Sequence, residues 1–156
     1  MAILRLTRVF HFDMAHVLLN YPGKCKNIHG HTYKLEVTVK GCPCNDDTSP
    51  KKGMLIDFSD FKILIQNEII TKWDHALMIH RDSDSVLLEA LQKNYEKIII
   101  VPFQPTTENM ICELAAIIQK ILPSDLQLFA LRLYETENSY AEWDASENYR
   151  IMVSKK

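Results

Sequence analysis

Residues 25–39, CKNIHGHTYKLEVTV, hold a clear strand pattern and a cluster of groups that can bind a metal. The apolar members of the pattern share one parity: Tyr33, Leu35, Val37 and Val39. Side chains of a strand project alternately to its two faces, so this alternation predicts a half-buried strand over residues 29–40. His29 and His31 have the apolar parity, and we expect both imidazoles to face the buried side.

A second alternating pattern covers residues 3–16 and ends at His16, which has the apolar parity. The intervening residues 17–28 contain Pro22-Gly23 and indicate a long turn that joins an antiparallel hairpin. In such a hairpin the end of the first strand lies beside the start of the second. His16 therefore approaches His29 and His31. Three histidines with one open coordination position are typical of catalytic zinc, so the sequence predicts a Zn²⁺ site.

Cys25 lies just before these candidate ligands, between Lys24 and Lys26. Positive neighbours favour the thiolate, which is the reactive form of cysteine. The spacing C-x-x-x-H also permits Cys25 to be a fourth zinc ligand, and an inert loop thiol is a further alternative. The spacing does not decide among these three roles.

Two further sites hold acid or base groups. Asp74 and His75 follow a predicted helix, and a solvated helix end is the simpler interpretation because adjacent side chains need not meet. Glu135 has the parity of Leu131 and Leu133, and a carboxylate on an apolar face is costly unless it is paired. It can pair with a basic side chain or accept the two parallel N–H donors of a 2-aminopyrimidinone ring.

The whole chain of 156 residues has the length and the 47% hydrophobic content of one globular domain, residues 1–156. Apolar stripes at helical spacing predict helices over residues 56–73, capped by Asp57, and 106–122. Further strands are expected over residues 95–103, 126–136 and 149–155. Hairpins around two helices predict an α+β fold, with the helices on one face of an antiparallel sheet.

Charge and hydropathy exclude some classes of protein. The net charge of −2 argues against a dedicated nucleic-acid binder. No apolar run is long enough for a membrane helix, and the first residues lack the pattern of a signal peptide, so a cytoplasmic protein is expected. The four cysteines are then expected to be thiols or metal ligands rather than a disulfide framework. Cys42 and Cys44 could bind a second metal, although a reduced pair in a surface loop is the simpler interpretation.

The order of several motifs resembles the 6-pyruvoyl-tetrahydropterin synthase / 6-carboxytetrahydropterin synthase family over nearly the whole chain. These motifs are FHFDMAH (10–16), CKNIHGHTY (25–33), GMLIDFSDFK (53–62), DHALM (74–78), PTTEN (105–109) and LYETENSYAEW (133–143). The resemblance implies the tunnelling fold, in which a four-stranded antiparallel sheet carries two helices on one face. Sheets of several subunits then join into a barrel, a homo-tetramer or homo-hexamer, with active sites at the interfaces.

The same resemblance implies roles for individual residues. His16, His29 and His31 would bind Zn²⁺, and Cys25 would abstract a proton together with Asp74 and His75. Glu135 would anchor the pterin ring of 7,8-dihydroneopterin triphosphate, near Thr106 and Thr107.

Two activities occur in this family. The 6-carboxy enzymes are lyases that release acetaldehyde and triphosphate on the route to queuosine, whereas the 6-pyruvoyl enzymes eliminate triphosphate without cleaving the side chain. The short gap between Cys25 and His29 resembles the 6-carboxy branch. A non-catalytic relative that binds zinc and pterin is the alternative to both. Met14 and Trp73 are bulkier than the residues usual in the family, so the volume of the pocket is expected to differ.

Overall fold

A six-stranded sheet organises the computed structural model, which describes residues 2–148. The strands are β1 (Leu4–His16), β2 (His29–Gly41), β3 (Ala76–His80), β4 (Ile98–Val101), β5 (Gln127–Thr136) and β6 (Ser139–Asp144). Their order across the sheet is β4-β3-β1-β2-β5-β6. β1 and β2 pair antiparallel over their full length, from Leu4 opposite Gly41 to His16 opposite His29. The hairpin expected from the two alternating patterns is confirmed.

Helical segments connect the strands. They are η1 (Lys24–Lys26), α1 (Phe58–Ile65), the π-helical turn η2 (Gln66–Ile70), α2 (Thr71–Trp73), α3 (Ser85–Asn94) and α4 (Thr107–Ile121). The Asp57 carboxylate accepts hydrogen bonds from the N–H groups of Ser59 and Asp60, as expected of an N-cap. The predicted helix over residues 56–73 corresponds to α1, η2 and α2 in succession. No helix within residues 2–148 has the length and hydropathy needed to cross a membrane.

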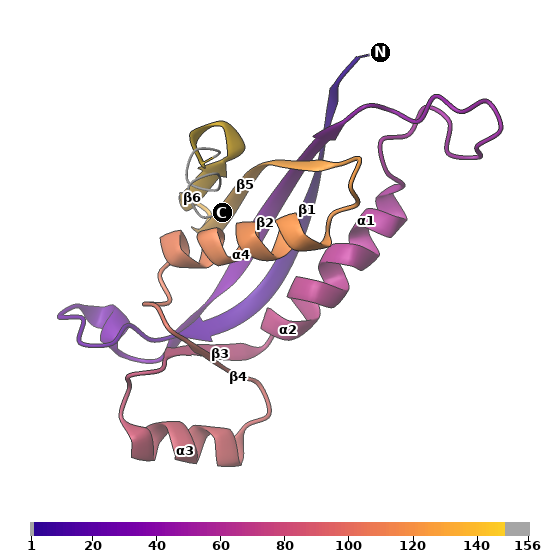
Figure 1. The fold of residues 1–156 in the computed structure, drawn as a ribbon. Helices are drawn as coiled ribbons and strands as arrows, with labels where there is room; N and C mark the ends of the chain where they lie inside the picture. The colour runs from indigo at the N-terminus through magenta and orange to yellow at the C-terminus, as the bar shows by residue number, and fades with distance from the viewer. Residues whose placement is uncertain (1, 149–156) are drawn as a thin grey trace, which may run out of the picture.

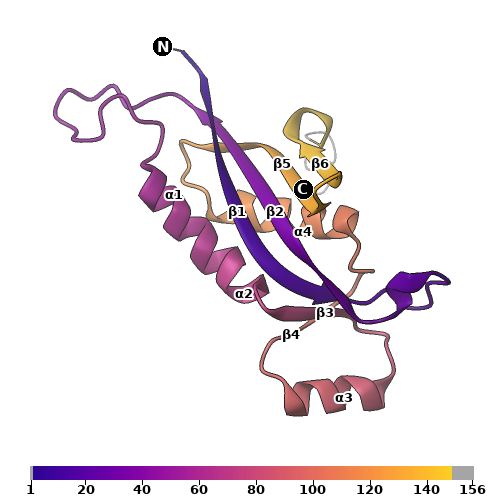
Figure 2. The ribbon, with the colours of Figure 1, turned by 180° about the vertical axis from the view of Figure 1, so that it is seen from behind.

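The helices α1 and α4 lie on the same face of the sheet, as predicted (Figure 1). Viewed from behind, β1 and β2 pass in front of α4, and α1 lies beside β1 (Figure 2). The core between the sheet and these helices includes four side chains with no exposure to solvent: Leu35 and Val37 of β2, Ile65 of α1 and Leu114 of α4. The opposite face of the sheet carries polar pairs, such as the hydroxyls of Thr7 and Thr38 at 2.8 Å.

The structure corrects the expected sheet in two ways. It has six strands where the family resemblance implied four, and it is mixed, because β3 pairs parallel to both β1 and β4. β3 follows α2 without a Gly or Pro signal, and β6 is a short polar strand, so neither has a strong pattern. The helix α3 was also missed, since only Leu91 in it is buried. The strand expected over residues 149–155 lies outside the described residues.

Candidate functional site

Three histidines converge at the end of the hairpin. His16 lies directly opposite His29 in the β1–β2 register, and His31 lies two residues further along the same face. One ring nitrogen from each histidine lies within 4.8 Å of the other two. The ring centroids of His16 and His29 are 4.5 Å apart. The predicted juxtaposition of the three imidazoles is confirmed, and together they could hold a metal ion.

Hydrogen bonds determine which nitrogen of two of these rings is free. His16 Nδ1 lies 2.7 Å from the carbonyl oxygen of Pro105, and His29 Nδ1 lies 2.8 Å from that of Asn27. A carbonyl oxygen only accepts, so each Nδ1 carries the hydrogen, and in the neutral ring each Nε2 then has the free lone pair. Histidines that bind metals commonly donate the second ring N–H in this way.

Two buried nitrogens of the cluster form no hydrogen bond. His16 Nε2 and His31 Nε2 are both inaccessible and have no hydrogen-bond partner among the described residues. Burial lowers the pKa of His16 against the opposing effect of the Pro105 carbonyl, which favours the neutral form that metals bind. An unpaired polar atom in the interior costs free energy, and a metal ion would satisfy both nitrogens at once. The residues therefore fit a metal ion.

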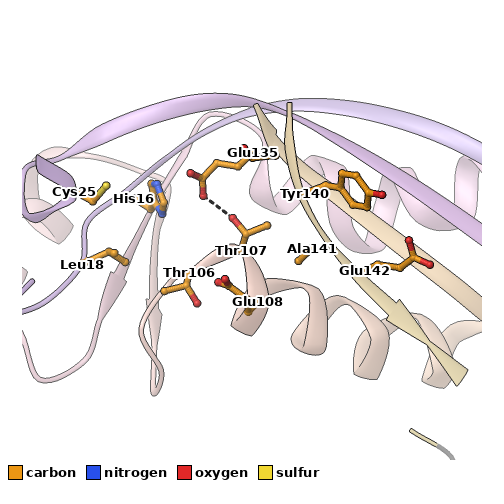
Figure 3. A pocket seen from close by; sticks show the side chains of 11 residues that line it. His16, Leu18, Cys25, Thr106, Thr107, Glu108, Glu135, Tyr140, Ala141 and Glu142 are labelled. Carbon is orange, nitrogen blue, oxygen red and sulfur yellow. Dashed lines mark hydrogen bonds between the residues drawn. The ribbon is translucent and has the colours of Figure 1, made fainter. Parts of the chain in front are cut away.

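A cavity of about 510 Å³ opens beside His16 (Figure 3). It is lined by side chains from η1, from the start of α4 and from β5 and β6. Besides His16, the lining residues with polar side chains are Cys25, Thr106, Thr107, Glu108, Glu135, Ser139, Tyr140 and Glu142. Segments far apart in the sequence therefore contribute to one concave site, as small-molecule sites usually require.

Cys25 lies in η1 as a half-buried free thiol on the wall of this cavity. The group of residues able to hold a metal contains His16, His29 and His31 without Cys25. Within residues 2–148 the geometry thus favours a thiol beside the candidate metal site over a fourth ligand. Cys42 and Cys44 are free thiols that join no such group within the same residues.

Glu135 reaches across the cavity from the end of β5. Its Oε2 accepts a hydrogen bond of 2.5 Å from the Thr107 hydroxyl (Figure 3). Its Oε1 lies 3.6 Å from His31 Nε2. No lysine or arginine is paired with Glu135 among the described residues, so the salt-bridge alternative is not supported. Thr106 caps α4 through its hydroxyl, which accepts from the Asn109 N–H.

Asp74 and His75 form a direct pair, contrary to the simpler interpretation from sequence. His75 Nδ1 lies 2.9 Å from Asp74 Oδ2. The backbone of His75 has a φ of 61°, a left-handed conformation that is uncommon outside glycine and that turns its ring back toward Asp74. Burial raises the pKa of Asp74, but the Asp13 N–H and the His75 ring outweigh it and leave that pKa below its usual value.

This pair does not join the cavity that Cys25 lines. His75 lines a separate hollow. The residues around that hollow include Asp13, Ala15, Gly30 and Thr32, whose parity is opposite to that of the histidine ligands, and also His31, which is one of those ligands. Within one chain, His75 and Cys25 therefore line different hollows.

Two residues of the site were not foreseen. Glu108 lines the cavity from the first turn of α4, and its place directly after Thr106 and Thr107 was a usable signal. Tyr33 is fully buried behind the histidines, and its hydroxyl has no partner among the described residues. Burial raises the pKa of Tyr33, and the negative charge of Glu135 adds to the effect, so the hydroxyl stays protonated.

Comparison with known proteins identifies relatives over most of the chain. The profile of the family described as 6-pyruvoyl tetrahydropterin synthase matches residues 5–146. A 6-carboxy-5,6,7,8-tetrahydropterin synthase of Haemophilus influenzae is 39% identical over 143 residues, covering 89% of this chain and 97% of that protein. A protein of the same name from Rickettsia typhi is 32% identical over 142 residues, covering 90% and 99%.

Solved structures share the fold at lower identity. The 6-pyruvoyl tetrahydropterin synthase of Caenorhabditis elegans superposes with a TM-score of 0.64 at 23% identity, covering 92% of this chain and 96% of that one. The Plasmodium vivax 6-pyruvoyl tetrahydropterin synthase gives a TM-score of 0.66 at 17% identity, covering 92% and 98%. The sequence match over residues 5–146, together with this shared fold, shows that the chain belongs to the 6-pyruvoyl tetrahydropterin synthase family.

Proposed function

We propose that this protein is a zinc-dependent lyase that converts 7,8-dihydroneopterin triphosphate to 6-carboxytetrahydropterin, with release of acetaldehyde and triphosphate. The observation that carries the proposal is one cavity bordered by three parts: the histidine cluster, the Cys25 thiol and the Glu135 carboxylate. The names of the curated relatives support the same substrate class. The product would enter queuosine biosynthesis in the cytoplasm.

His16, His29 and His31 would hold Zn²⁺, because three neutral imidazoles suit zinc and leave a position for the substrate. When bound, zinc would lower the pKa of the side-chain hydroxyls of the substrate. Glu135 would accept the N–H donors of the pterin ring through its carboxylate. The Thr107 hydroxyl already donates to Glu135 Oε2 and would hold that carboxylate in position, with Thr106 beside it.

Cys25 would remove a proton from the substrate side chain as a thiolate, and Asp74 and His75 would relay protons. Because His75 and Cys25 line different hollows in one chain, the pair beside a given Cys25 would come from a second subunit. A homo-oligomer, a tetramer or a hexamer, would therefore be required for activity. It would also cover the open edges of β4 and β6.

The 6-carboxy activity is preferred because Cys25 precedes His29 by only four residues, and the curated relatives with the name 6-carboxy synthase include one at 39% identity. The alternative is a 6-pyruvoyl synthase, which would eliminate triphosphate and leave the side chain intact. The solved structures with that name are less similar in sequence, at 17% and 23% identity.

The test is to incubate the zinc-loaded protein with 7,8-dihydroneopterin triphosphate and measure acetaldehyde, triphosphate and bound zinc, for wild type and Cys25→Ala. The lyase predicts equimolar acetaldehyde and triphosphate, with turnover lost and zinc retained in Cys25→Ala. Triphosphate without acetaldehyde would indicate the 6-pyruvoyl enzyme. Wild type without turnover, and Cys25→Ala with lowered zinc content, would indicate a non-catalytic zinc and pterin binder.

A further inference from the structure

The side chain of Gln104 forms two hydrogen bonds with the backbone of Leu19, in the loop of residues 17–28. Its Oε1 accepts a hydrogen bond of 2.9 Å from the Leu19 N–H, and its Nε2 donates one of 2.6 Å to the Leu19 carbonyl. Both bonds are partly buried and join residues 85 positions apart. A glutamine amide thus pairs with both backbone groups of one residue, as a neighbouring strand would.

The loop that Gln104 bonds to, residues 17–28, also contains Cys25. The N–H of Leu18 donates a hydrogen bond of 2.9 Å to the Cys25 carbonyl, which ties the first part of residues 17–28 to η1. The side chains of Leu18 and Cys25 both line the cavity beside His16 (Figure 3). Gln104 is therefore connected to the backbone of Cys25 through two consecutive residues, Leu19 and Leu18.

The backbone of Gln104 is in turn hydrogen-bonded to residues at the start of α4. Its carbonyl accepts hydrogen bonds from the Thr106 N–H at 2.7 Å and from the Asn109 side chain at 2.9 Å. The next residue, Pro105, accepts from His16 Nδ1. Two adjacent residues before α4 therefore have linked roles. Gln104 bonds to the Cys25 loop, and Pro105 orients His16, a candidate metal ligand.

We propose that Gln104 is a positioning residue. Its two hydrogen bonds to the Leu19 backbone hold the Cys25 thiol in place relative to His16 and Glu135. Its importance for turnover rests on the role proposed above for Cys25, whereas its effect on the position of the thiol does not. Without the amide, two partly buried backbone groups of Leu19 lose their partner, and residues 17–28 lose their connection to the start of α4.

Two variants separate the parts of this interaction. Gln104→Glu is nearly isosteric and can still accept from the Leu19 N–H, but its carboxylate cannot donate to the Leu19 carbonyl. Gln104→Met removes both bonds at similar volume. The matched controls are Gln92→Glu and Gln92→Met, because Gln92 is exposed on α3. All variants are made in a Cys42→Ser/Cys44→Ser/Cys112→Ser background, so that Cys25 is the sole thiol.

The experiment uses the zinc-loaded full chain and measures Leu19 amide exchange, Cys25 alkylation by iodoacetamide, bound zinc, unfolding temperature and kcat. Both Gln104 variants are expected to speed Leu19 exchange and to change the alkylation rate at least about tenfold, which corresponds to about 1.4 kcal/mol. Zinc content should stay at the wild-type level, kcat should fall with little change in KM, and the Gln92 variants should match wild type.

Unchanged Leu19 exchange and unchanged alkylation in Gln104→Glu would overturn the proposal, even if kcat fell. A lower unfolding temperature with wild-type alkylation would also overturn it, because the amide would then only stabilise the fold. If Gln104→Met does not fold, Gln104→Glu decides alone. A wild-type protein without turnover would refute the proposed function and leave the exchange and alkylation results to decide the role of Gln104.

Discussion

At the scale of the residue, the clearest feature is that two buried nitrogens, His16 Nε2 and His31 Nε2, form no hydrogen bond among the described residues. The Nδ1 atoms of His16 and His29 bond to the carbonyls of Pro105 and Asn27, and one ring nitrogen of each of the three histidines lies within 4.8 Å of the others. Since backbone carbonyls orient the rings of His16 and His29, the fold itself holds these two rings in position for a metal ion. Binding should therefore stabilise the fold rather than create it.

Removal of the metal tests this. With free zinc about 100 times above Kd, binding to the native state alone adds about 2.7 kcal/mol to the free energy of unfolding. We expect calorimetry to show a lower unfolding temperature after chelation, restored by added zinc. His29→Gln should lose this response, whereas His11→Gln should keep it, because His11 is exposed and outside the cluster. Identical unfolding temperatures of wild type with and without zinc would contradict a metal site here.

Glu135 gives the second prediction at this scale. Glu135→Gln replaces one acceptor oxygen with an NH₂ group that opposes the N–H donors of the pterin ring. A lost hydrogen bond to a charged group costs about 1.5–3 kcal/mol, so KM should rise roughly 10- to 150-fold while zinc content stays unchanged. Glu137→Gln, an exposed position two residues away, serves as the control. A wild-type KM in Glu135→Gln would show that this carboxylate does not hold the ring.

At the scale of the element, the junction of α2 and β3 places the Asp74–His75 pair. The left-handed backbone of His75 is stabilised by its N–H, which donates to the Asp13 carbonyl at 2.7 Å. Lys97, just before β4, donates to the carbonyls of Thr71 and Asp74 at 3.1 and 2.8 Å. The hydrogen bonds of β1 and of Lys97 together fix the turn that brings the two side chains into contact.

Lys97→Met should therefore loosen this turn without touching the cavity beside Cys25. A loss of about 1.4 kcal/mol in the placement of the pair would lower kcat about tenfold, with KM and zinc content near wild type. Lys97→Arg should retain part of the activity, since it can still donate. Lys93→Met on the last turn of α3 is the control. Steady-state kinetics with an unaltered kcat in Lys97→Met would show that the lysine is dispensable for the pair.

At the scale of the whole molecule, the two halves of the proposed machinery lie in different hollows of one chain. Cys25 lines the cavity beside His16, whereas His75 of the Asp74–His75 pair lines a second hollow and not that cavity. A site that uses both must be completed by a second copy of the chain.

Complementation between two inactive variants tests this arrangement. Cys25→Ala and His75→Ala should each be inactive alone. When they are co-expressed, random assembly should restore about a quarter of the active sites, those with Cys25 from one variant and His75 from the other. Acetaldehyde release by the purified mixed oligomer is the measurement, with the variants mixed after assembly as the control. An inactive co-expressed mixture would place both residues of each site on a single chain.

Much of the site followed from strand parity alone. His29 and His31 had to share the face of Tyr33 and Leu35, and antiparallel pairing had to bring His16 beside them, because side chains alternate with a period of two. Glu135 followed from the same rule. By contrast, β3 and β6 were missed, because short strands without turn signals are recognised only once their neighbours pair with them.

The sequence by itself determined the hairpin, the two main helices, the histidine cluster and the family, since all of these depend on local periodicity and ordered motifs. Only the tertiary structure decided that Asp74 and His75 form a pair, that His75 lies outside the cavity of Cys25, and that Gln104 is hydrogen-bonded to the Cys25 loop. The physical reason is that these contacts depend on one backbone φ angle, on the parallel pairing of β3, and on hydrogen bonds between segments up to 85 residues apart.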